Sequence, residues 1–173
     1  MILKGVSADM LVDWVRGAVQ VFSQLPGMEM ENCGYCTIRS VVDGRVLLTF
    51  EVGHCPDEKA AKYWALSIEK GQRLFNHPDH ASSFQSRDEN ATVQVFGEVQ
   101  EWGHWAGAIR ALDGILSFSG LPELGDEAVM LIAGIKSRRL FGSGAQKIAE
   151  ISSNPYLEPM IRASGAMPLS AWE

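Results

Sequence analysis

Two stretches of the chain place a run rich in apolar residues on either side of an Asp-Gly pair. The first covers residues 35–52 around Asp43, and the second covers residues 107–118 around Asp113. Asp-Gly between two such runs is typical of a tight β-hairpin, because these residues tolerate the positive φ angles of the turn. The sequence therefore predicts two antiparallel hairpins.

A two-residue turn in the first hairpin would pair Thr37 with Phe50 and Arg39 with Leu48. Apolar residues then lie on both faces of the two strands, as in a sheet that is covered on both sides. Arg39 fits poorly opposite Leu48, which indicates either a shifted register or a sheet edge.

Apolar residues recur at helical spacing in four further segments. The expected helices cover residues 7–24, 56–75, 123–138 and 145–153. Ser7 is a suitable N-cap for the first of them. The second has an apolar stripe that includes Trp64 and Ile68. Acidic side chains favour the start of the third through its helix dipole; they are Glu123, Asp126 and Glu127.

Residues 92–102 carry the remaining strand signal, and Gly97 indicates a bulge within it. With the two hairpins, this predicts an α+β fold with a central antiparallel sheet of about five strands and helices on its faces. We expect a single domain over residues 1–173. Its core covers about residues 8–153, and residues 154–173 form a C-terminal tail without clear periodicity.

The composition is that of an ordinary globular protein, with 173 residues of which 46% are hydrophobic and 21% are charged. A net charge of −6 argues against nucleic acid and membrane partners. We find no apolar run that could span a bilayer and no secretory signal, so a cytoplasmic location is expected. Three cysteines do not make a disulfide framework.

Three of the four histidines lie between the second helix and the second hairpin: His77, His80 and His104. An imidazole can bind haem iron or a metal ion. Trp102 and Trp105 flank His104 and would offer apolar walls to a macrocycle. The alternative is that these histidines are solvated loop residues beside a helix end.

Further candidates are polar residues near the same segment. Ser82, Ser83 and Arg87 either form the floor of a polar pocket or belong to a solvated loop. Ser119 and Gly120 either offer backbone N–H groups to an anion at a helix start or form a plain strand-to-helix corner.

The cysteines do not predict a metal site. Cys33, His54 and Cys55 would meet at the open end of the first hairpin, with Cys36 as a fourth ligand, but a second paired motif is absent. Buried free thiols are the simpler interpretation. The sequence contains no catalytic Ser/His/Asp pattern, phosphate loop or dinucleotide fingerprint, so catalytic residues stay unknown.

The run GAIRALDGILSFSGLPELGDEAVML at residues 107–131 resembles the GlcG-like family, also called the haem-degrading domain family. VVDGRVLL at residues 41–48 is similar to the first hairpin of that family. This resemblance implies a profilin-like three-layer α/β/α fold and a homo-oligomer. It also implies binding of haem or a corrinoid-type cofactor.

The leading hypothesis is therefore a small-molecule binding domain of the GlcG-like type, with haem or another tetrapyrrole as its ligand. A first alternative is a flavoprotein, because residues 92–102 and the preceding helix also resemble FMN-binding split barrels of the pyridoxamine-phosphate-oxidase type. A yellow purified protein would favour that alternative. A second alternative is a non-catalytic assembly domain.

Haem titration tests the histidine candidates. Ligation of the iron predicts a Soret band that weakens when His77, His80 or His104 is replaced. Unchanged spectra in all three variants would exclude these residues as ligands.

Overall fold

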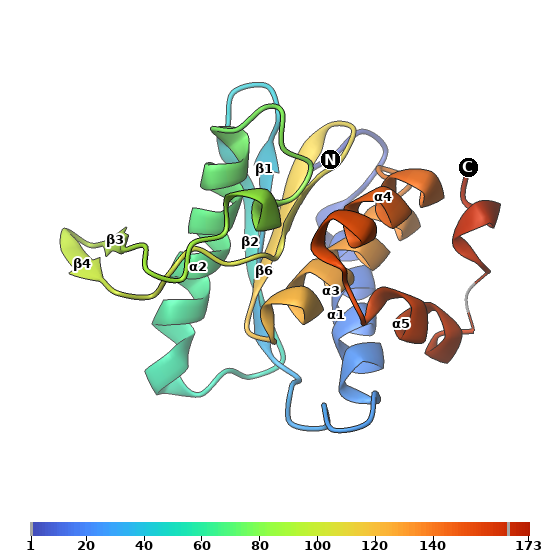
Figure 1. The fold of residues 1–173 in the computed structure, drawn as a ribbon, viewed down its shortest axis with the longest axis horizontal. Coiled ribbons are helices and arrows are strands. Elements are labelled where there is room, and N and C mark those ends of the chain that lie inside the picture. Colours follow the sequence, from blue (N-terminus) through green and yellow to red (C-terminus); the bar gives the residue numbers. More distant parts are fainter. Residues whose placement is uncertain (1, 166) are drawn as a thin grey trace.

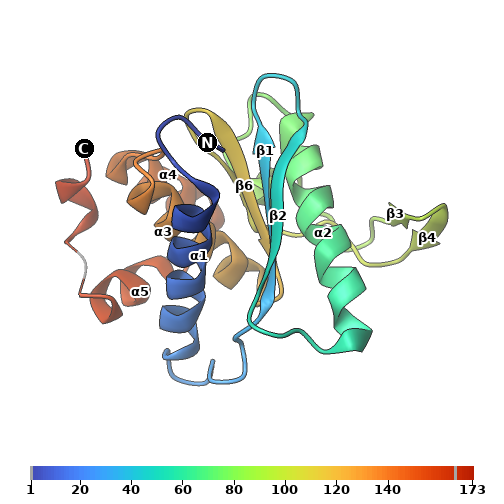
Figure 2. The ribbon, with the colours of Figure 1, turned by 180° about the vertical axis from the view of Figure 1, so that it is seen from behind.

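The computed structural model describes residues 2–165 and 167–173 and has an α+β fold. Its main sheet is antiparallel, with the strand order β2-β1-β6-β5. The strands are β1 (Gly34–Ser40), β2 (Val46–Val52), β5 (Ala108–Arg110) and β6 (Gly114–Ser119). Helix α2 (Asp57–Phe75) covers one face, and α1 (Ala8–Ser23) and α3 (Glu123–Lys136) cover the other, as Figures 1 and 2 show. The predicted covering of both faces is confirmed.

The first hairpin has a wider turn than the sequence predicted. β1 and β2 pair Thr37 with Thr49, one residue away from the predicted register. A bulge then places Arg39 opposite Val46. The Ser40 hydroxyl accepts hydrogen bonds from the backbone N–H groups of Val42 and Asp43 within the turn, at 3.1 and 3.4 Å, and so stabilises the longer connection. The predicted register was therefore wrong. The poor fit of Arg39 opposite Leu48 had indicated a shifted register.

The second hairpin reverses one residue earlier than expected. The Ala111 N–H donates to the Gly114 carbonyl at 2.9 Å, so Leu112 and Asp113 are the central residues of the turn. The Asp113 carboxylate holds this turn, because it accepts a hydrogen bond from the Lys4 N–H at 2.9 Å. Both Asp-Gly pairs nevertheless lie at chain reversals, as predicted.

Residues 92–102 do not add a fifth strand to the main sheet. They form a separate hairpin of β3 (Val93–Val95) and β4 (Glu98–Gln100), which projects beyond α2 in Figure 1. Gly97 lies in its turn and not in a bulge, with Phe96 and Gly97 at φ angles of 51° and 81°. Of the six strand residues only Val93 is buried, so this hairpin has no apolar face with which to join the sheet.

The C-terminal segment belongs to the folded core. Helix α3 is buried along most of its length, because α4 (Gly142–Ser152) and α5 (Leu157–Ala163) lie against it. Leu157, Met160 and Ile161 of the predicted tail are buried. A helix of seven residues is too short to show a periodic pattern, which explains why the sequence did not reveal it. None of the helices in the described ranges is long and apolar enough to cross a membrane.

The interface between α2 and the sheet mixes apolar and polar residues. Leu74 packs against Ala108 and Ile115. Ser67 and Lys70 are also buried, whereas Trp64 and Ile68 of the predicted apolar stripe are only half-buried. The Ser67 hydroxyl lies 2.8 Å from the Thr37 hydroxyl in β1. Hydrogen bonds between buried polar groups therefore help to hold this helix on the sheet beside a small apolar cluster, while the large apolar core fills the opposite interface.

The close approach of β1 to β6 gives a test of this packing. A Cβ atom at Gly34 would lie 2.5 Å from the Phe118 ring and from the Ser119 carbonyl oxygen. We expect Gly34→Ala to lower the free energy of unfolding by about 1–3 kcal/mol, because the core must shift to admit the methyl group. Gly17→Ala in α1 is the matched control, since its Cβ would meet no atom within 4 Å. It should stabilise by about 0.5–1 kcal/mol through helix propensity. Equal urea midpoints for the two variants would contradict this packing.

Candidate functional site

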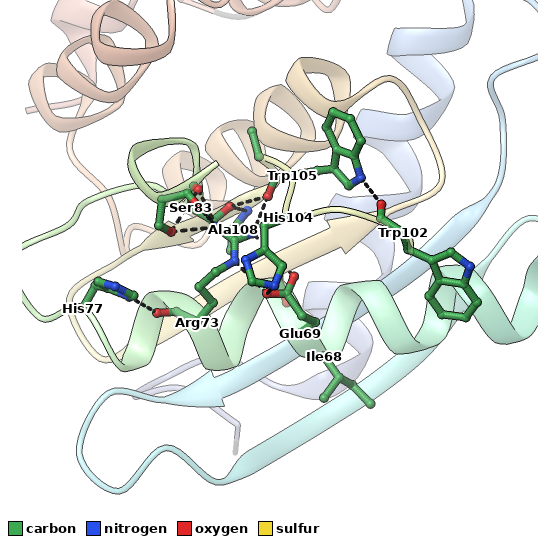
Figure 3. A network of polar contacts seen from close by, with 12 residues as sticks. Ile68, Glu69, Arg73, His77, Ser83, Trp102, His104, Trp105 and Ala108 are labelled. Carbon is green, nitrogen blue, oxygen red and sulfur yellow. Dashed lines mark hydrogen bonds and ion pairs between the residues drawn. The ribbon is translucent and has the colours of Figure 1, made fainter. Parts of the chain in front are cut away.

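The Arg73 side chain organises residues 76–107, the largely polar segment between α2 and β5. Its guanidinium donates hydrogen bonds to the carbonyls of Ser83 and Trp105, both at 2.7 Å, and to the Ser86 hydroxyl at 2.6 Å. Glu69 accepts a further bond from Arg73 Nε at 2.7 Å. Figure 3 shows this network, with His77 at one end and the indoles of Trp102 and Trp105 at the other. The segment is thereby held against α2, and a pocket lies on either side of it.

The tryptophan pocket has a volume of about 490 Å³ and lies between α2, the segment and the start of α3. Trp102, Trp105 and Tyr63 give it aromatic surface. Ser119 and Gly120, predicted as anion-binding residues, also line it. The two tryptophans and the corner between β6 and α3 therefore line the same pocket.

A buried ion pair forms part of this pocket. Lys70 Nζ lies 2.8 Å from Asp126 Oδ2, and both side chains are 2% exposed. Lys70 also donates to the Phe118 carbonyl at 3.0 Å, and Asp126 accepts from the Leu121 N–H at 2.9 Å. Burial raises the pKa of Asp126 above its ordinary value, and the Lys70 ammonium opposes this rise.

The sequence did not identify this pair as a candidate. Asp126 was interpreted as a charge at a helix start, but it is buried and faces Lys70. Lys70 lies four residues from both Leu66 and Leu74, which are buried on α2, and this spacing was the available signal. Gly107 makes room for the pair, since a Cβ there would lie 2.9 Å from Lys70 Nζ.

Two cations lie over the tryptophans of this pocket. Lys62 Nζ is 5.7 Å from the centre of the Trp102 ring, and the Arg87 guanidinium carbon is 4.8 Å from that of Trp105. Arg87 is bound to Glu123 at 2.8 Å. Lys62 forms no ion pair with any residue in the described ranges. It is therefore the cation available to a ligand.

The histidine pocket lies on the other side of the segment and has a volume of about 590 Å³. His77 and His104 both line it. His80 stacks on His77, with ring centres 4.8 Å apart and an angle of 10° between the planes. His104 Nε2 lies 3.6 Å from Glu69 Oε1. The structure thus brings two predicted histidines to one pocket, but it places the tryptophan walls in the other.

Ser82 and Ser83 belong to the buried framework. The Ser83 hydroxyl donates to the Trp105 carbonyl at 3.2 Å and accepts from the Ala108 N–H at 3.0 Å. The Ser82 hydroxyl donates to Glu127, which is fully buried. These residues therefore connect the segment to β5 and α3, and their hydroxyls are already engaged.

The cysteines occupy different environments. Cys36 and Cys55 are buried, Cys33 is half-buried, His54 is exposed, and all three thiols are free. Within residues 2–165 and 167–173, no group of three or more His, Cys, Asp or Glu side chains is placed to hold a metal ion.

Comparisons with protein-family models, curated proteins and solved structures find no match to this chain.

Glu127 is a buried carboxylate without a cationic partner in the described part of the chain. It accepts hydrogen bonds from the Ser82 and Ser152 hydroxyls and from Asn154 Nδ2. Burial raises the pKa of Glu127, and these hydrogen bonds oppose the rise. The folded state therefore holds a proton on Glu127 over a range of pH in which the unfolded chain has lost it.

This difference predicts a pH dependence of stability. The unfolded glutamate loses its proton near pH 4.3, so the contribution of Glu127 to the free energy of unfolding falls as pH rises from there through the folded pKa. Glu127→Gln should remove this contribution, and the variant should gain stability relative to the wild type as pH rises. Urea unfolding between pH 4 and pH 8 measures the difference, with the exposed Glu150→Gln as control. Parallel curves for wild type and Glu127→Gln would contradict the prediction.

Proposed function

We propose that this protein is a small-molecule binding domain whose ligand lies in the tryptophan pocket. The observation that carries this proposal is the buried Lys70–Asp126 pair within an aromatic pocket of about 490 Å³. Taking two charges out of water is costly. Polar groups that converge in a pocket of this size, one of them a carboxyl with a raised pKa such as Asp126, are typical of ligand sites.

The aromatic surface of the pocket suits a planar ligand, and one cation at its rim can pair with a carboxylate of that ligand. Trp102 and Trp105 offer indole faces for stacking. Lys62 is free to pair with a carboxylate at the rim. A tetrapyrrole has both features, and it is also the ligand implied by the resemblance to the GlcG-like family.

The arrangement of elements supports the same classification. Hairpin β1-β2 leads into α2, hairpin β5-β6 leads into α3, and the two helices lie on opposite faces of the sheet. A profilin-like α/β/α fold has helices on both sides of an antiparallel sheet. We therefore include the profilin-like fold and the GlcG-like type in the proposal.

Iron coordination is not part of this proposal. The residues that line the tryptophan pocket include no histidine, whereas His77 and His104 line the other pocket. The tryptophan pocket would hold a macrocycle by stacking and by ion pairing with its carboxylates. Binding should then be independent of the iron.

The flavin alternative receives less support from the fold. The main sheet is open, with β2 and β5 at its edges, whereas a split barrel closes its sheet.

Binding of protoporphyrin with and without iron tests the proposal. We expect both forms to quench tryptophan fluorescence with similar affinity. Trp102→Ala should weaken both by about tenfold, because it removes one stacking face. His77→Ala and His104→Ala should leave both affinities unchanged. Trp172→Ala, on the C-terminal segment, is the matched control for loss of an indole.

Two results would contradict the proposal. One is binding of the iron form alone, with loss of binding in the histidine variants, which would place haem in the histidine pocket. The other is absence of binding by both forms, which would exclude tetrapyrroles of this kind as ligands.

A further inference from the structure

The histidine pocket has no role in the function proposed above, yet it is the larger of the two. It lies between the C-terminal half of α2 and the segment that includes Ser86, Asp88, β3 and His104. Figure 3 shows His77, Glu69 and His104 on this side of the network. Its lining contains three ordinarily charged side chains besides the histidines: Glu69, Arg73 and Asp88.

The only permanent cation of the lining is fully engaged. Arg73 is 7% exposed, and it donates to Glu69 and to the carbonyls of Ser83 and Trp105. It therefore cannot pair with an anionic ligand without breaking the network that holds the segment. This arrangement disfavours phosphates and carboxylates as ligands.

Two side chains of the lining, His77 and Asp88, stay available as acceptors. His77 Nδ1 lies 2.7 Å from the Arg73 carbonyl, which can only accept, so Nδ1 carries the hydrogen of the neutral ring. Nε2 then carries the lone pair. The Asp88 carboxylate is exposed and forms no ion pair with a residue of the described ranges. A ligand that donates hydrogen bonds and carries positive charge fits these groups.

Two features favour an organic cation over a metal ion. The described residues hold no cluster of three or more metal-binding side chains, and Glu69 is already paired with Arg73. The pocket also has apolar surface from Ala65, Ile68 and Val93. Such surface suits a hydrocarbon chain and offers nothing to a hydrated metal ion.

We propose that the histidine pocket binds an alkylammonium ion. Its ammonium group pairs with the Asp88 carboxylate, its carbon chain lies against Ala65, Ile68 and Val93, and His77 Nε2 provides a further acceptor. A diamine can use both acceptors, so it should bind more tightly than a monoamine of the same length.

Isothermal titration calorimetry of the full chain with 1,4-diaminobutane and n-butylammonium tests the proposal. Both amines should bind, whereas butyrate and n-butanol should not. Asp88→Asn should weaken diamine binding by about tenfold, because it removes the charge. In the wild type, Asp88 Oδ1 accepts a hydrogen bond from the Asn90 N–H at 3.0 Å. The asparagine keeps a side-chain oxygen for this bond, so the local turn is retained.

Matched variants separate the two pockets. Glu89→Gln removes a neighbouring exposed carboxylate that does not line the pocket and should leave the affinity unchanged. Trp102→Ala should also leave it unchanged. Absence of amine binding, equal binding of butyrate, or full affinity in Asp88→Asn would overturn the proposal.

Discussion

The guanidinium of Arg73 is the contact on which the two pockets depend. Few apolar residues of the segment between α2 and β5 are buried, so its position depends largely on hydrogen bonds. Arg73 satisfies the carbonyls of Ser83 and Trp105 and is neutralised by Glu69. A buried arginine without these partners would be strongly unfavourable. The segment consequently crosses α2 in one position and separates the tryptophan pocket from the histidine pocket.

Helix α3 is anchored by polar contacts on two sides. Asp126 faces α2 through Lys70, whereas Glu127, the next residue, faces Ser82 and the end of α4 through Ser152. Apolar packing is non-directional, but these hydrogen bonds specify the rotation of the helix about its axis. The start of α3 and the preceding corner are thereby placed beside Trp105. Buried polar groups in this protein thus position the pocket.

The contrast between the two faces of the sheet explains which elements could be predicted. The first helix and both chain reversals were readable, because Ser7 caps α1 and each Asp-Gly pair lies at a reversal. The register of β1-β2 was not, because the Ser40 side chain widens the turn by local hydrogen bonds that hydrophobic alternation does not describe. The projecting hairpin at residues 93–100 was misassigned for a related reason. Alternation predicts a strand, but it does not say which sheet the strand joins.

Local pattern by itself determined the α+β class, the positions of most helices and the segment in which candidate site residues occur, since capping, periodicity and turn chemistry act over a few residues. It also identified His77, His104, Trp102 and Ser119 as residues of interest. Only the tertiary structure divided them between two pockets and revealed the Lys70–Asp126 pair. These partners are 56 residues apart, and their burial is decided by how α2 and α3 meet across the sheet. A charged residue that finds a buried partner has the same local sequence pattern as one that faces water, so the distinction arises only when distant segments come together.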